Sequence, residues 1–146
     1  MNSGHNTIVF DTSTIIGAVL FPESPPARAF YHAAINHQLV ASGETLNELR
    51  EVLCREKFNQ WRTEAERTKF LALYLDVVGI VVVTSQVQDC RDPKDNKFLS
   101  LACSAEADCI VTSDDDLLVL HPYRGIQIVT VRQYLEIMKN RADGIL

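Results

Sequence analysis

Residues 90–118, CRDPKDNKFLSLACSAEADCIVTSDDDLL, carry the strongest fold signal in this chain. They read as an amphipathic helix, a short apolar strand and a run of aspartates that opens a further helix. Carboxylates occur here at two kinds of position, with Asp92 and Asp95 at the start of the first helix and Asp114 just past the strand. Clustered carboxylates repel one another, and burial raises the cost of their charge. Several of them aimed at one place therefore indicate a binding site for something cationic.

Outside this stretch, further apolar runs of strand length alternate with helical patterns. The predicted strands are Thr7–Phe10, Gln38–Ala41, Ile80–Thr84, Cys109–Thr112 and Gln127–Val131. The predicted helices lie at about Ser13–Leu20, Pro26–His37, Gly43–Arg55, Thr63–Val78, Pro93–Ala105, Asp115–Leu120 and Val131–Asn140. The runs IVF and IVVV are apolar at successive positions, which is typical of strands buried on both faces. The alternation predicts a parallel sheet between two layers of helices, a three-layer α/β/α fold.

Length and composition narrow the class of protein. The 146 residues favour one domain, which we expect to span 1–146 with its core at about 7–140. No apolar run approaches the ~20 residues of a membrane helix, and the N-terminal segment lacks the basic and apolar regions of a signal peptide. We therefore expect a cytoplasmic protein with no membrane partner. The net charge of −5 argues against holding nucleic acid by bulk electrostatics, but bound divalent ions would reverse the local field, so a nuclease is not excluded.

Cysteine and histidine give no sign of a metal site. The cysteines, at Cys54, Cys90, Cys103 and Cys109, form no CxxC pair, and the histidines are not spaced to complete a zinc site. We expect reduced and mostly buried thiols. The carboxylates are therefore the main candidates for chemistry.

Two aspartates directly follow predicted strands. Asp11 follows the first strand and Asp114 follows the fourth. In open parallel sheets, ligands bind at the carboxyl ends of the strands, so both side chains belong to the expected active edge. Each aspartate also fits the N-cap of the helix that follows it, a position that Asp favours. Taken alone, Asp11 fits both interpretations equally, whereas Asp114, which stands before DDLLVL, fits the N-cap well.

Helix geometry separates Asp92 from Asp95. Asp92, Pro93 and Asp95 fit the N-cap, N1 and N3 positions of a helix. At about 100° per residue, Asp95 projects within the apolar face that includes Phe98 and Leu101, whereas Asp92 lies off the edge of that face. A capping acid has no need to face the core. We therefore interpret Asp92 as the cap and Asp95 as the functional acid.

Glu48 lies on the boundary of the apolar face of its predicted helix, beside Val52. A side chain at that position can reach a cleft at the end of the sheet. Thr45 and Glu48 also match a capping box, which would give Glu48 a structural role instead. Taken alone, Glu48 fits the structural role better.

Together, acids from four separate segments converge on one edge of the predicted sheet. Hard oxygen ligands without a partnering His or Cys suit Mg²⁺ or Mn²⁺. No Gly-rich phosphate loop and no G-x-S-x-G elbow occurs. An aspartyl-phosphate enzyme of the haloacid-dehalogenase type would have a second Asp at the position of Ser13, and a receiver domain would have paired acids after the first strand and a late Lys. Residue 13 is Ser, the first strand is followed by a single Asp, and the last strand, IQIVTV, has no Lys, so the chain fits neither pattern.

With these residues in place, the chain resembles PIN-domain ribonucleases, close to the toxin components of type II toxin–antitoxin pairs. The matching pieces are IVFDTSTIIGAVL, SGETLNELREVLCREKF, RDPKDNKFLSLACSAEADCIVTSDDDLLVL and IQIVTVRQYLE, in the family's order from about residue 7 to 136. The combination DxxDNKFLxLA followed by ADxIVTxDxDLL is highly specific.

The resemblance implies a strand order of 3-2-1-4-5 and a catalytic, metal-binding set of acids. Carried over position by position, this set falls on Asp11, Glu48, Asp95 and Asp114. The supporting positions beside it are Ser13, Thr112 and Asp116, with Asp92 as the helix cap. The resemblance also implies an antitoxin protein that covers the cleft, and homodimers are common among such domains.

On this basis we expect a Mg²⁺- or Mn²⁺-dependent endoribonuclease. Asp11, Asp95 and Asp114 would bind one or two ions, with Glu48 as a ligand or as the group that orients water. Basic residues that could meet RNA phosphates, although each type is more often a solvated surface residue, are Arg28, Arg91, Lys94, Lys97 and Arg124. Two alternatives stay open: a non-catalytic PIN-fold module that binds protein, and a metal-dependent phosphatase.

Overall fold

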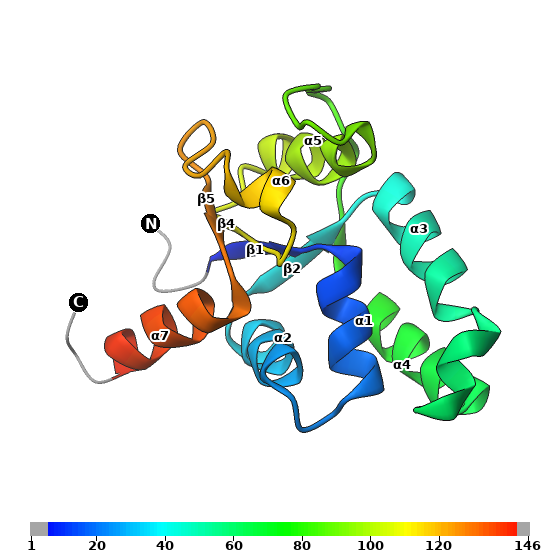
Figure 1. Cartoon of the computed structure of the whole chain (residues 1–146). Coiled ribbons are helices and arrows are strands. Elements are labelled where there is room, and N and C mark those ends of the chain that lie inside the picture. The colour runs from blue at the N-terminus through cyan, green and yellow to red at the C-terminus, as the bar shows by residue number, and fades with distance from the viewer. Residues whose placement is uncertain (1–5, 143–146) are drawn as a thin grey trace.

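The central element is a five-stranded parallel sheet of order β3-β2-β1-β4-β5, as expected (Figure 1). The structure is a computed structural model that describes residues 6–142, so the expected domain 1–146 extends beyond the described residues at both ends. The strands are β1 (Thr7–Phe10), β2 (Gln38–Ala41), β3 (Gly79–Ile80), β4 (Cys109–Val111) and β5 (Gln127–Val129). β1 and β4 are neighbours in the middle of the sheet, with Phe10 opposite Val111.

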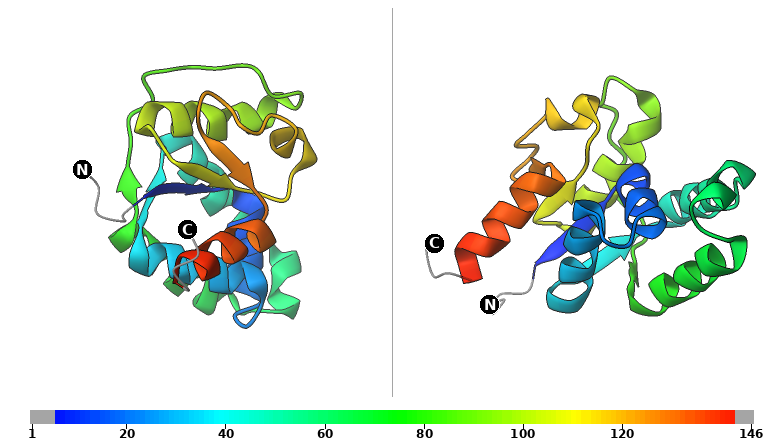
Figure 2. Two further views of the ribbon diagram at one scale, coloured as in Figure 1. Left: turned by 90° about the vertical axis from the view of Figure 1, so that its left-hand side faces the viewer. Right: turned by 60° about the horizontal axis from the view of Figure 1, so that its bottom comes forward.

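Helices cover both faces of this sheet (Figures 1 and 2). Two apolar cores lie between the layers. Side chains alternate along β1, so Ile8 and Phe10 enter one core and Val9 enters the other. The first core packs against α1 (Thr12–Leu20), α2 (Pro25–Asn36), α3 (Gly43–Leu53), α4 (Glu64–Val77) and α7 (Val131–Ala142). The second packs against α5 (Asn96–Ala105) and α6 (Asp115–Leu118). The predicted three-layer arrangement is confirmed.

Local sequence signals place most helices within two residues of their predicted ends. Ser24 caps α2 directly before a proline, and Thr63 and Glu66 form a capping box on α4. The predicted helix Pro93–Ala105 is divided, because its first residues form the 3₁₀ helix η2 (Pro93–Asp95) before α5 begins at Asn96. A second 3₁₀ helix, η1, spans Glu56–Gln60. No helix within residues 6–142 is both long and apolar enough to cross a membrane.

The third strand is much shorter than predicted. β3 ends at Ile80, and residues 81–92 run beside α5 without strand pairing, so the predicted strand Ile80–Thr84 is wrong beyond its first residue. The interpretation of IVVV as buried on both faces is also wrong, since Ile80 is 58% exposed and Val82 is 80% exposed. These residues lie at the edge of the sheet, where one side of the chain faces solvent.

All four cysteines are free thiols, as expected. Cys90 and Cys109 are buried and Cys103 is half-buried. Cys54 is exposed directly after the end of α3 at Leu53, so the expected burial does not hold for this thiol.

Candidate metal centre

Asp11 stands at the carboxyl end of β1 with its carboxylate almost fully buried, at 4% exposure. One oxygen, Oδ1, accepts hydrogen bonds from the Thr14 backbone N–H at 3.0 Å and from the Ser13 hydroxyl at 3.4 Å. The other oxygen, Oδ2, accepts from the hydroxyl of Thr112. Burial raises the pKa of Asp11, and the hydrogen bonds from Thr112, Thr14 and Ser13 oppose that rise.

Thr112 links the ends of the two central strands. It is fully buried directly after β4, where it donates to Asp11 and accepts from the Asp114 backbone N–H at 2.9 Å. Asp114 caps α6, since its Oδ1 accepts from the Asp116 N–H at 2.9 Å. Both Asp11 and Asp114 are therefore N-caps, and this does not compete with a metal-binding role because the two oxygens of a carboxylate offer about four acceptor positions, more than the hydrogen bonds here occupy.

Asp95 has the strongest signature of a shared acidic site. Its pKa is raised to about 7, first by burial, then by a hydrogen bond with Asp114 and by the charges of Asp114, Asp92 and Asp11. Its Oδ2 is buried and has no hydrogen-bond partner among the residues that the structure describes. A buried carboxylate oxygen without a donor, crowded by other acids, is an unfavourable arrangement that a cation would relieve.

Asp92 and Asp116 complete a close group with Asp95. One carboxylate oxygen from each lies within 4.8 Å of the others, and all three side chains are half-buried. Asp92 also caps η2 as predicted, because its Oδ1 accepts from the Lys94 N–H at 3.0 Å. An all-oxygen set of this charge fits a hard divalent cation such as Mg²⁺ or Mn²⁺.

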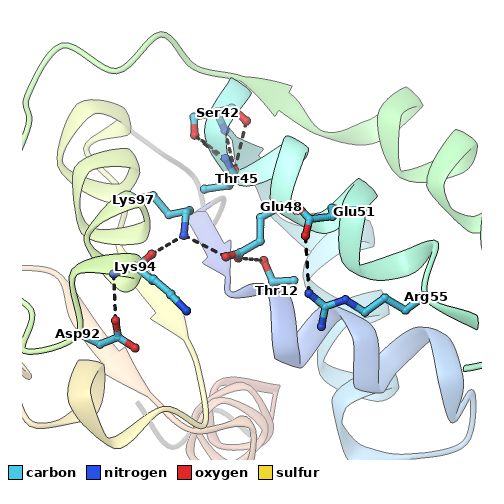
Figure 3. A network of polar contacts seen from close by, with 9 residues as sticks. All are labelled: Thr12, Ser42, Thr45, Glu48, Glu51, Arg55, Asp92, Lys94 and Lys97. Carbon is cyan, nitrogen blue, oxygen red and sulfur yellow. Dashed lines mark hydrogen bonds and ion pairs between the residues drawn. The ribbon is translucent and has the colours of Figure 1, made fainter. Parts of the chain in front are cut away.

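Glu48 projects from α3 and is held by two partners, Thr12 and Lys97 (Figure 3). Its Oε1 accepts from the Thr12 hydroxyl at 2.5 Å, and its Oε2 forms an ion pair with Lys97 Nζ at 2.9 Å. The expected capping box of Thr45 with Glu48 is wrong, because Thr45 pairs with Ser42 instead. Glu48 is thus released from capping and directed towards the residue that follows Asp11.

The structure therefore brings Asp95, Asp114, Asp92 and Asp116 together, with Asp11 close enough for its charge to affect Asp95. Glu48 is not a member of this group and, within residues 6–142, is linked to Asp11 only through Thr12, the next residue along the chain, whose hydroxyl it accepts. Ser13 is exposed and bonds to Asp11. Cys90 lies next to the same acids, since burial and the charges of Asp95, Asp114 and Asp116 raise its pKa.

The five basic candidates have different surroundings. Lys97 is only 10% exposed and bonds to Glu48 and to the Lys94 carbonyl oxygen. Arg124 pairs with Asp89 at 3.6 Å. Arg91 and Lys94 are exposed on the segment that carries Asp92 and Asp95, whereas Arg28 is exposed near the start of α2, past the far end of α1 from Asp11.

Sequence reasoning missed Thr12 and the ion pair of Lys97 with Glu48. Thr12 directly follows Asp11, so its position in the sequence could have indicated a place at the site. Its hydrogen bond to Glu48, however, depends on α3 lying alongside α1. The pairing of Lys97 depends on two helices whose contact no local pattern shows.

The fold and these acids identify the class of protein. The chain belongs to the PIN domain family, whose model matches residues 7–116, a span that contains every acid described above. A relative is the uncharacterized protein MJ1680 of Methanocaldococcus jannaschii, 28% identical over 118 residues that cover 77% of this chain and 74% of that protein.

Solved structures share the fold at low identity. PAE2754 from Pyrobaculum aerophilum matches with a TM-score of 0.61 and 15% identity over 94% of this chain and 93% of that one. VapBC2 from Rickettsia felis, solved bound to a DNA fragment from the promoter, matches with a TM-score of 0.58 and 12% identity over 85% and 98%. DNA-bound VapBC from Salmonella typhimurium matches with a TM-score of 0.57 and 15% identity over 86% and 98%.

Proposed function

We propose that this protein is a Mg²⁺- or Mn²⁺-dependent endoribonuclease. The observation that carries the proposal is the state of Asp95, whose buried Oδ2 has no partner in residues 6–142 and whose pKa is raised to about 7 among neighbouring acids. Membership of the PIN domain family, which typically comprises metal-dependent nucleases, supports it. A bound cation would supply a partner for Asp95 and offset the repulsion among the neighbouring carboxylates.

In this proposal Asp11, Asp95 and Asp114 hold one or two ions, and Glu48 is a ligand or orients the attacking water. Asp92 and Asp116 lie close enough to Asp95 to share in holding them. When bound, the ion lowers the pKa of water, polarises the scissile phosphate and stabilises the leaving oxygen. In-line attack by water would leave a 5′-phosphate and a 3′-hydroxyl.

Neighbouring side chains position these acids. The Thr112 hydroxyl fixes Asp11 Oδ2 and also holds the backbone at Asp114. The Thr12 hydroxyl and Lys97 hold the two oxygens of Glu48, so its carboxylate is oriented before substrate arrives. Ser13 adds a weaker contact to Asp11.

The substrate in this proposal is single-stranded or loop RNA, which suits a site at an open sheet edge. Arg91 and Lys94 are the best placed of the basic candidates, because they lie exposed on the segment of Asp92 and Asp95. We propose a smaller contribution to RNA binding from the other basic candidates, Arg28, Lys97 and Arg124. Lys97 and Arg124 already have acidic partners.

We extend the proposal to a cellular role as the toxin of a toxin–antitoxin pair. The similarity of the fold to two VapBC structures supports this role, and the partner would be an antitoxin protein that covers the acids. A single domain over 1–146, a cytoplasmic location and a homodimer belong to the same proposal.

The experiment is cleavage of end-labelled single-stranded RNA by the purified chain with Mg²⁺, Mn²⁺ or EDTA. We expect cleavage with either ion, none with EDTA, and products that carry 5′-phosphates. Cleavage that survives EDTA would contradict the proposal. Release of phosphate from small esters with intact RNA would favour the phosphatase alternative, and inactivity towards both would favour the protein-binding module.

A further inference from the structure

A pocket of about 450 Å³ is lined by residues on both sides of Asp92 and Asp95 in the sequence and has no role in the chemistry proposed so far. Its walls come from α5, the start of α3 and the segment 81–92. Its volume is in the ~300–1,000 Å³ range of pockets that bind small molecules. Polar side chains line most of it, chiefly Glu44, Gln86, Gln88, Asn96 and Lys97.

The wall formed by segment 81–92 is held in place although it has no regular secondary structure. Asn96, Ser100 and Ser104 follow one another at intervals of four along α5, so they lie on one face of the helix. The Ser104 hydroxyl accepts from the N–H groups of residues 84 and 85, the Ser100 hydroxyl from residue 87, and the Asn96 side chain from residue 90. The pocket is therefore pre-formed.

The pocket and the acidic group share one stretch of chain. Cys90, Pro93, Asn96 and Lys97 line the pocket, and Asp92 and Asp95 stand between them in the sequence. Lys97, two residues after Asp95, lines the pocket. Its ammonium group bonds to Glu48 (Figure 3). A nucleotide in the pocket would therefore be next to the phosphate at the acids.

The lining favours a nucleobase over a phosphate. Glu44 would repel a phosphate, and the charge of Lys97 is already offset by Glu48. The side-chain amides of Gln86 and Gln88 can each donate and accept, as the Watson–Crick edge of a base requires. Val87 and Pro93 add apolar surface that the face of a base could contact.

We propose that this pocket binds one unpaired RNA base beside the cleaved phosphate and selects bases that carry an amino group. The proposal rests on the proposed function. A carboxylate only accepts hydrogen bonds, so Glu44 can pair with the N6 amino group of adenine, the N4 amino group of cytosine or, with the base turned in the pocket, the N2 amino group of guanine. Uracil has no amino group, and its one donor on this edge, N3–H, lies between two carbonyl oxygens that repel the carboxylate. Loss of a charged hydrogen bond of this kind corresponds to roughly a tenfold preference.

The first test maps cleavage sites in a pool of single-stranded RNA with one randomised position on each side of the cut, in Mn²⁺. We expect the wild type to disfavour uracil roughly tenfold at one position, and Glu44→Gln to abolish that preference. The double variant Gln86→Ala, Gln88→Ala should raise KM several-fold with a smaller change in kcat. Matched controls are Glu51→Gln, an exposed acid on α3 that pairs with Arg55, and Gln60→Ala, an exposed amide on η1.

A second test separates this inference from the proposed function. Nucleoside 5′-monophosphates contain no diester to cut, so their binding in Mg²⁺ can be followed by NMR at the side-chain amides of Gln86 and Gln88. Shifts with AMP, CMP or GMP that exceed those with UMP would support the pocket even if the protein cleaved no RNA, a result that would overturn only the nuclease. Cleavage with unchanged base preference and KM in the variants, or absence of amide shifts, would overturn only the pocket.

Discussion

The two oxygens of the buried Asp11 carboxylate are held by different parts of the chain, one by the start of α1 and the other by Thr112 after β4. Thr112 also accepts from the N–H of Asp114, so one hydroxyl fixes acids from two strands. Asp11, Asp95 and Asp114 could be predicted from the sequence because each stands at a strand end or on a helix face. The hydroxyl that joins them depends on β1 and β4 being neighbours.

Replacement of Thr112 by Val should therefore destabilise the protein. The change keeps the shape but removes the hydrogen bond to buried Asp11 and leaves the Asp114 N–H without its acceptor, at a cost of about 1–3 kcal/mol. Urea denaturation at pH 7 without metal measures this loss in the free energy of unfolding. Thr112→Ser, which keeps the hydroxyl, is the control, and equal stability of Thr112→Val and wild type would contradict this role.

The raised pKa of Asp95 makes a prediction about pH. Its ordinary value is about 4, so between about pH 4 and 7 the folded protein holds a proton that the unfolded chain has released. The metal-free protein should therefore lose stability as pH rises through this window. The raised pKa of Asp11 acts in the same direction.

Asp95→Asn should remove part of this pH dependence and raise Tm at pH 7.5 relative to wild type. Thermal melts from pH 4.5 to 8 in EDTA measure both effects, with Asp115→Asn, an exposed acid on α6, as the control. A variant with an unchanged pH profile would show that Asp95 is not under strain from its neighbours.

Among the elements, the chain after β3 is where sequence reasoning failed. The run IVVV has the composition of a buried strand, but strand β3 is at the edge of the sheet and its pairing stops at Ile80. Side chains of α5 then accept the N–H groups that a strand would have paired. Composition could not show this, because the acceptors are two serines and an asparagine on a helix. The serines lie 13 to 20 residues further along the chain than the N–H groups they accept.

Ser100→Ala tests that arrangement. The Ser100 hydroxyl is buried and accepts from the Val87 N–H at 3.0 Å, so its loss should cost about 1–3 kcal/mol and speed hydrogen exchange at that amide. Ser113→Ala, at an exposed position, is the control. Unchanged exchange at Val87 would show that the segment is held by other contacts.

Helix capping explains why Glu48 was hard to assign from the sequence. Thr45 and Glu48 have capping-box spacing, yet Ser42 one turn earlier forms the box with Thr45. Two overlapping cap signals on one helix cannot be ranked by local pattern alone, since the choice depends on where β2 ends.

At the scale of the whole molecule, the strand order places the acids. β1 and β4 lie side by side in the middle of the sheet (Figure 1), so Asp11 and Asp114 emerge together at the carboxyl ends of these strands. Asp95, the residue directly before α5, is close enough to both for their charges to raise its pKa. The layers could be predicted from the alternation of strands and helices, and the strand order from the resemblance of the motifs to the PIN domain family. The extent of the domain stays a prediction.

Binding of Mn²⁺ should stabilise the whole fold. At an ion concentration of 100 times Kd, linkage contributes about 2.7 kcal/mol, enough to raise Tm by several degrees. The increase in Tm should be absent from the double variant with both Asp11→Asn and Asp95→Asn, because it lacks two of the proposed ligands. Equal increases in both proteins would indicate that the ion binds elsewhere.

The most direct measurement is the rate of Mn²⁺-dependent cleavage of labelled RNA by three proteins. These are the wild type, the double variant with both Asp11→Asn and Asp95→Asn, and the control Asp115→Asn. Melts in EDTA should first show that all three proteins are folded. Removal of two ligands should lower the rate on the order of 100-fold or more, while the control stays within about threefold of wild type. Undiminished cleavage by the double variant would contradict the account, because the acids that the fold brings together would then not be the site of the reaction.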